Sequence, residues 1–278
     1  MHNMKYRFIL ILVLNFFLFN YLIAQEGEKL FLRVKFSVTG QEYLDKNKRF
    51  NDLYNLDIGQ NASMFFSHTE FLRDSVKKDL QKKGYYGLEV MESLNEQGYR
   101  QGQKDVTISN RSKNQYINYT IIGARLFSAK EPIEKIDWKI LKDTAIIFQY
   151  KCIKATTNYK GREWVVWFAP EIHINTGPWK FHGLPGLILK AEDSENHYMF
   201  ECVDILKIDR DINLSRWSES REVPKDEFVK LLMKFKTNPI DFTTNQAGIS
   251  GKVRIFKKDG TPVPNSKYQN YKYNPIEL

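Results

Sequence analysis

Alternation of apolar and polar residues predicts a β-strand early in the chain. Every second residue from Leu32 to Val38 is apolar, and Arg33 and Lys35 lie between them. Successive side chains of a strand point to opposite faces, so this pattern is typical of a strand with one buried face. Further runs rich in β-branched and aromatic residues predict strands at 55–59, 116–122, 136–140, 146–155 and 164–168.

The region around residue 190 predicts a β-hairpin. Apolar runs at 187–191 and 198–205 flank four polar residues at 193–196, a length that suits a hairpin loop. Strands that follow one another without helices between them favour an antiparallel sheet. We therefore expect a mainly β fold, an antiparallel curved sheet or partial barrel with two amphipathic helices, which by content would also fit an α+β class.

The first helix is predicted over residues 68–83. Ser67 and Glu70 form the Ser-x-x-Glu pattern of a capping box, apolar residues then recur every four positions, and Gly84 suits the position after a helix. The next stretch, 84–114, is rich in Gly, Asn, Gln and Lys and predicts a long loop.

The second helix is predicted over residues 225–236. Pro224 suits the first turn of a helix. Apolar residues then follow the helical spacing that buries one stripe. These residues are Phe228, Leu231, Leu232 and Phe235.

The first 24 residues have the pattern of a secretory signal peptide. Lys5 and Arg7 precede an apolar run that ends at Ala24, a small residue suited to cleavage. The alternative is an uncleaved N-terminal anchor, because ~20 apolar residues span a membrane. We divide the chain into a signal peptide at 1–24 and a single domain at 25–278. The mature protein is then exported to the periplasm or the outer membrane, with no integral membrane segment of its own.

Composition narrows the class of protein. The chain has 278 residues, of which 42% are hydrophobic and 14% aromatic, and this excludes wholesale disorder. Lys and Arg number 42 against 33 Asp and Glu, a net charge of +9. Lysines at 77, 78, 82 and 83 fit a solvated helix face, so we expect no nucleic-acid partner.

Gly and Pro residues concentrate at 177–189, the most unusual stretch of the chain. Pro185 and Gly186 suit the two central positions of a type II turn, and Trp179 and Phe181 precede them. The stretch is either a structural corner that begins a core strand or a rigid wall of a binding groove. In the second interpretation the binding residues are Trp167, Trp179, Phe181, Leu184 and Pro185.

Residues 183–188 read GLPGLI, and this hexapeptide resembles the motif that defines the GLPGLI family of secreted proteins from bacterial cell envelopes. Other segments that match the family lie at 154–156, 161–162, 167–172, 177–181 and 273–278. The family often has Pro where this chain has His173. The resemblance implies an exported protein without a settled activity. Members are often encoded near TonB-dependent outer-membrane receptors, which implies an accessory role in uptake and does not imply an enzyme.

Arg162 is a further candidate for ligand binding. It follows Gly161 at the start of a predicted strand, where its guanidinium could hold a carboxylate or phosphate with two hydrogen bonds. The alternative is a salt bridge within the protein, to Glu171 or Asp193.

The two cysteines, Cys152 and Cys202, would lie in an oxidising compartment after export. We expect either a disulfide between neighbouring strands or two buried thiols. A disulfide would close a long loop and, in the loop-entropy model, would contribute ~3–4 kcal/mol.

Metal binding is the chemical alternative. Three histidines, His173, His182 and His197, lie around the distinctive stretch, and imidazole ligands suit copper or zinc. We take His182 and His197 as the candidate ligands of this alternative, but no pair has the tight spacing of metal ligands on one element, which favours ordinary surface histidines. None of the usual catalytic motifs occurs in the sequence, so we assign no catalytic residue.

These patterns lead to one functional expectation and two alternatives. The leading interpretation is an exported cell-envelope binding or accessory protein for an outer-membrane receptor, with an apolar or peptide-like ligand and no resident cofactor. A copper or zinc carrier or a metal-dependent hydrolase is the second interpretation, and a purely structural envelope component is the third.

Overall fold

The computed structural model describes residues 28–46, 48–212, 217–248, 255–256, 261–263 and 269–277. The predicted signal peptide at 1–24 lies outside these residues. Within the described part of the chain, no helix has both the length and the apolar character needed to cross a membrane.

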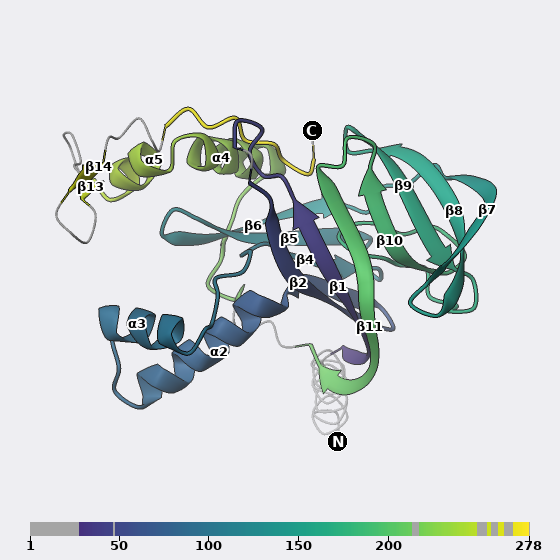
Figure 1. The fold of residues 1–278 in the computed structure, drawn as a ribbon, viewed down its shortest axis with the longest axis horizontal. Helices are drawn as coiled ribbons and strands as arrows, with labels where there is room; N and C mark the ends of the chain where they lie inside the picture. Colours follow the sequence, from purple (N-terminus) through teal and green to yellow (C-terminus); the bar gives the residue numbers. More distant parts are fainter. Residues whose placement is uncertain are drawn as a thin grey trace, which may run out of the picture.

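Twelve strands form one large sheet (Figure 1). Its order is β12-β6-β5-β4-β3-β2-β1-β11-β10-β9-β8-β7, and every neighbouring pair is antiparallel except β12 and β6. The strands are β1 (Lys29–Gly40), β2 (Phe50–Gly59), β3 (Ala62–Ser67), β4 (Val106–Asn110), β5 (Gln115–Ile122), β6 (Arg125–Pro132), β7 (Lys139–Ile147), β8 (Tyr150–Tyr159), β9 (Arg162–Ala169), β10 (Leu187–Asp193), β11 (Tyr198–Asp211) and β12 (Arg221–Glu222). The expected mainly β fold with an antiparallel curved sheet is confirmed.

Four helices accompany this sheet in the described residues, where we expected two. They are α2 (His68–Lys82), α3 (Leu88–Glu96), α4 (Lys225–Thr237) and α5 (Pro239–Gln246). The two expected helices correspond to α2 and α4. In Figure 1, α2 and α3 extend from one side of the sheet, whereas α4 lies across the part that contains β5 and β6. A separate two-stranded sheet pairs β13 (Ile255–Phe256) with β14 (Pro262–Val263).

The start of α2 forms half of the expected capping box. Ser67 Oγ accepts a hydrogen bond from the backbone N–H of Glu70 at 2.9 Å. The Glu70 carboxylate does not return to Ser67, because it accepts instead from Gly102 N at 3.1 Å. The helix is therefore capped by its own serine and fastened by Glu70 to the segment that leads into β4.

The predicted loop at 84–114 is wrong in two places. Residues 88–96 form α3, whose Val90 and Leu94 pack against Leu80 of α2, and 106–110 form β4. Residues 125–132 form β6, which we did not predict because its sequence mixes apolar with charged residues and ends in proline. Strands β4 and β6 form because they pair with neighbouring strands, and their local sequence propensity does not indicate them.

The predicted hairpin around residue 190 is confirmed. Strands β10 and β11 pair antiparallel, with Lys190 opposite Glu201 and Ala191 opposite Phe200. The largest apolar core lies between the half of the sheet that contains β1 and β2 and the half that contains β8–β10. The loop at 170–186, between β9 and β10, contributes Trp179, Phe181 and Leu184 to this core.

Candidate functional site

A cavity of about 580 Å³ lies between α4, the sheet and the C-terminal segment at 269–277. Val229 and Met233 of α4 form part of one wall, and they are 46% and 37% exposed. Tyr54 and Phe65, stacked at 4.7 Å between ring centroids, lie on the sheet side. Large apolar surface is therefore accessible inside a concavity, the usual form of a small-ligand site.

A cluster of charged side chains lines part of this cavity. Lys180 of the 170–186 loop forms ion pairs with Glu131 of β6 and with Glu277. Lys225, at the start of α4, contacts the other oxygen of Glu131 at 2.6 Å. The side chains of Lys180 and Glu131 are each 2% exposed, whereas that of Lys225 is 38% exposed and reaches solvent.

The environment of Glu131 keeps its carboxylate ionised. Burial alone would raise its pKa, but the positive charge of Lys180 opposes this effect. Hydrogen bonds from Lys180 and Lys225, and one from Asn118 at 2.8 Å, add to that opposition. Together they lower the pKa of Glu131 to about 2. Glu131 is thus an anion at neutral pH and has no proton to donate.

Arg162 fastens the C-terminal segment to the sheet. Its guanidinium donates to Asn274 Oδ1 at 2.5 Å, to the Pro275 carbonyl at 2.6 Å and to the Ile276 carbonyl at 3.1 Å. It also donates to Asp193 Oδ2 at 2.7 Å and approaches His197 Nδ1 at 3.3 Å. All five N–H donors are thereby engaged, and the side chain is buried. Arg162 has the internal salt bridge to Asp193, and no donor is left for the expected ligand role.

The two aromatic residues predicted to bind ligand from the 170–186 loop, Trp179 and Phe181, differ in whether they reach the cavity. Trp179 lines the cavity, with φ +55°, a left-handed conformation that bulky residues rarely adopt. The rings of Trp164, at 5.7 Å, and Phe181, at 5.2 Å, pack against it. Phe181 and Leu184, the other predicted binding residues of this loop, are each 1% exposed, pack in the core and do not line the cavity.

The corner at 184–186 is a narrower turn than expected. Gly186 N donates to the Leu184 carbonyl at 2.9 Å, which closes a three-residue turn around the exposed Pro185 rather than a four-residue type II turn. A Cβ atom on Gly186 would lie 2.4 Å from the Ala169 carbonyl oxygen, so close backbone approach requires glycine here. The structural-corner interpretation describes this stretch.

Trp167 lies on β9, outside the lining of the cavity. It is partly buried against the main core, and Lys154 Nζ lies 5.8 Å from its ring centroid. Its contacts therefore lie within the sheet.

The two histidines proposed as metal ligands lie in separate clusters. His182 Nδ1 contacts Tyr116 Oη at 2.9 Å, whereas His197 Nδ1 contacts Glu195 at 2.9 Å. Ligand atoms of Asp193, Glu195 and His197 lie within 4.8 Å of one another. However, Arg162 is bonded to Asp193 and lies 3.3 Å from His197, and its positive charge would oppose a bound cation.

Cys152 and Cys202 are free and buried, the second of the two expected alternatives. Burial raises the pKa of Cys152 to about 11 and that of Cys202 to about 12. Both thiols therefore remain protonated at neutral pH, which makes them poor nucleophiles and poor metal ligands.

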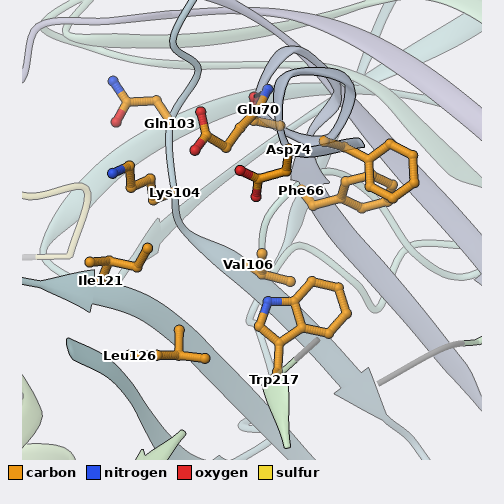
Figure 2. Close-up of a pocket in the computed structure, with 11 residues that line it drawn as sticks. Phe66, Glu70, Asp74, Gln103, Lys104, Val106, Ile121, Leu126 and Trp217 are labelled. Carbon is orange, nitrogen blue, oxygen red and sulfur yellow. Dashed lines mark hydrogen bonds between the residues drawn. The ribbon is translucent and has the colours of Figure 1, made fainter. Parts of the chain in front are cut away.

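A smaller pocket of about 120 Å³ lies between α2 and strands β3–β6. Figure 2 shows Glu70 and Asp74 at one end and Trp217 with Leu126 at the other. Its volume is close to that of a few water molecules, so we prefer the apolar cavity beside α4 as the candidate site.

Sequence reasoning missed most residues of the larger cavity. Tyr54, Glu131, Tyr198 and Tyr273 come from four distant segments. One available signal was the ending at 273–278, which belongs to the family resemblance, because Tyr273, Pro275, Ile276 and Glu277 line the cavity.

A family model described as "N-glycanase peptide, N-terminal domain" matches residues 90–227, just under half of the chain. Two solved structures of PNGF-II, in space groups P21 and C2, are each 13% identical to the chain and cover 74% of it with a TM-score of 0.51. The chain spans about a third of their length, 34% and 33%. No curated protein sequence matches the chain. These comparisons show that the chain has a mainly β fold similar to part of PNGF-II.

Proposed function

We propose that the chain is an exported cell-envelope binding protein, accessory to an outer-membrane receptor, which holds an apolar or peptide-like ligand in the cavity between α4 and the sheet. The observation that carries this proposal is the cavity itself. Its volume of about 580 Å³ suits a small ligand or a short peptide segment. Exposed Val229 and Met233 provide apolar contact, and Lys225 and Glu277 provide polar contact.

The resemblance to the GLPGLI family supports export and the accessory role. The GLPGLI segment forms the corner that leads into β10, and the 170–186 loop before it places Trp179 and Lys180 in the cavity wall. The family motif is therefore part of the framework that shapes the site, rather than the surface that touches the ligand.

Binding of an uncharged apolar fluorophore, N-phenyl-1-naphthylamine, tests the cavity. We expect saturable binding to the wild-type protein and a loss of at least about tenfold in affinity for Met233→Glu, because a charge would be placed in the apolar wall. Leu72→Glu on α2 is the matched control, since Leu72 is 41% exposed and lies outside the cavity. Equal binding by all three proteins would refute the proposed site.

The accessory role needs a second measurement. Affinity purification of the tagged protein from native membranes, followed by mass spectrometry, should recover an outer-membrane receptor. Recovery of the protein alone, under conditions in which known receptor complexes remain intact, would refute the accessory role and leave the binding site as a separate question.

A second candidate function is a glycan-associated domain, and the match to the N-glycanase N-terminal domain favours it. Aromatic rings such as Tyr54 and Trp179 in the cavity offer faces that could stack on sugar rings. An N-glycosylated peptide and the same peptide without glycan separate the two candidates. Tighter binding of the glycosylated form favours the glycan-associated domain, and equal binding favours the peptide-like ligand.

A further inference from the structure

A second cavity of about 580 Å³ shares no lining residue with the first. It lies where the 170–186 loop meets the turns that join β2 to β3 and β4 to β5. Arg111, His173 and His182 line it, and no aspartate or glutamate does. Its side chains therefore offer a guanidinium and two imidazoles as hydrogen-bonding groups.

Only part of the Arg111 guanidinium is hydrogen-bonded within the described residues. Its Nη2 donates to the carbonyls of Gly59, at 2.5 Å, and Gln60, at 2.8 Å. Among the described residues it forms no ion pair, and its Nε and Nη1 make no hydrogen bond. Burial lowers the pKa of Arg111, an effect that the charge of Glu28 opposes. A half-buried guanidinium with unused donors is a ready partner for an anion.

The contacts of His182 leave one of its ring nitrogens unassigned. Tyr116 Oη donates to the Lys180 carbonyl at 2.9 Å. His182 Nδ1 lies 2.9 Å from Tyr116 Oη and 3.0 Å from the same carbonyl, so a proton on Nδ1 satisfies these contacts. Nε2 then remains available for a hydrogen bond with a ligand.

The charges around this cavity favour an anion over a metal ion. Two imidazoles are present, but no carboxylate or thiolate lines the cavity to complete a metal site. The positive charge of Arg111 would also repel a metal ion, whereas it would attract a carboxylate or a phosphate.

We propose that this second cavity binds an anionic small molecule through its carboxylate or phosphate group, with Arg111, His173 and His182 as the contacting side chains. Ser109, Asn175 and Thr176 line the same space and supply neutral polar groups. The site is independent of the apolar cavity beside α4, so either can exist without the other.

Isothermal titration of the full chain with inorganic phosphate and with acetate tests the proposal and distinguishes the two anions. We expect saturable binding of at least one of them. Arg111→Gln should weaken that binding at least about tenfold, because a hydrogen bond to a charged group is lost. Arg100→Gln, at an exposed arginine outside the cavity, should leave the affinity unchanged.

Arg111→Gln could lose binding because it misfolds, so His173→Gln provides a second variant. His173 is exposed, and its replacement leaves the hydrogen bonds of Arg111 to the turn intact. It should weaken anion binding while thermal unfolding stays at the wild-type temperature. Absence of binding of both anions, or equal binding by Arg111→Gln and wild type, would overturn the proposal. Stoichiometric zinc binding that requires His173 and His182 would overturn it in favour of a metal site.

Discussion

Lys180, on the loop between β9 and β10, forms a buried ion pair with Glu131 on β6. Seven strands stand between β6 and β9 in the order of the sheet (β5, β4, β3, β2, β1, β11 and β10), so the pair joins two distant parts of it. A second contact, from Tyr116 Oη on β5 to the Lys180 carbonyl at 2.9 Å, reinforces the same junction.

Breaking this pair should destabilise the fold. Lys180→Met leaves Glu131 buried without its main partner, and loss of one member of a buried pair costs about 3–5 kcal/mol. Chemical denaturation measures the change in the free energy of unfolding. Lys135→Met is the control, because the side chain of Lys135 is 88% exposed and its pair with Asp137 should contribute little.

The lowered pKa of Glu131 leads us to predict that the folded protein loses stability in acid. Its pKa is lowered from 4.5 to about 2, so between these values the unfolded chain binds the proton and the folded chain does not. The contribution is complete above pH ~4.5 and is lost as the pH falls towards 2, a change on the order of 3 kcal/mol. Unfolding of Glu131→Gln measured across this range should lack that component. Glu134→Gln, with a side chain 53% exposed, should retain it.

Replacement of Arg162 by lysine should loosen the C-terminal segment. Lysine keeps the charge but has three donors in place of five, so bonds to Asn274, Pro275 or Ile276 are lost. We expect faster amide hydrogen exchange in residues 271–277 and a loss of about 1–3 kcal/mol in unfolding free energy. Arg125→Lys, at an exposed arginine, is the control. Unchanged exchange would contradict the fastening role of Arg162.

Gly186→Ala should destabilise the corner by steric clash. The new methyl group would lie 2.4 Å from the Ala169 carbonyl oxygen, which forces β9 and β10 to shift at a cost of about 1–3 kcal/mol or more. Gly84→Ala separates clash from backbone strain, because Gly84 has φ +89° with no atom within 4 Å of its added Cβ. Thermal unfolding should show the larger loss at Gly186, and equal losses would exclude the clash.

The cysteines should resist thiol reagents in the folded protein. With the pKa values of Cys152 and Cys202 raised to about 11 and about 12, neither thiolate is populated at pH ~8. Iodoacetamide should modify both residues only after unfolding in guanidinium chloride. An intact mass lower by two hydrogens, restored by reductant, would show a disulfide instead.

Local sequence patterns predicted the elements that local rules govern. Alternation identified β1, and the serine cap with its apolar period identified α2. Alternation could not identify β3, because all six of its residues are buried and apolar residues do not alternate with exposed ones. The apolar period failed in part on α2, because Leu72 is exposed and Arg73 is buried against the Tyr99 carbonyl. Burial on both faces and pairing with distant chain segments leave no periodic signal.

The candidate site was less predictable than the fold. Trp179 and Lys180 are adjacent in sequence to the recognised motif, but Glu131 and Tyr198 join them only through the topology of the sheet. A buried glutamate in β6 looks, in sequence, like any surface glutamate, since its partners Lys180 and Lys225 are 49 and 94 residues away. The structure alone assigns them to one cluster.

The junction between the 170–186 loop and strands β5 and β6 consists of side-chain contacts and contains no strand pairing. The two distant parts of the sheet are consequently joined here by an ion pair and one tyrosine hydroxyl, in addition to the apolar core, and not by backbone hydrogen bonds between strands. A substitution at Lys180 or at Tyr116 therefore acts on tertiary packing and leaves every backbone hydrogen bond between the strands in place.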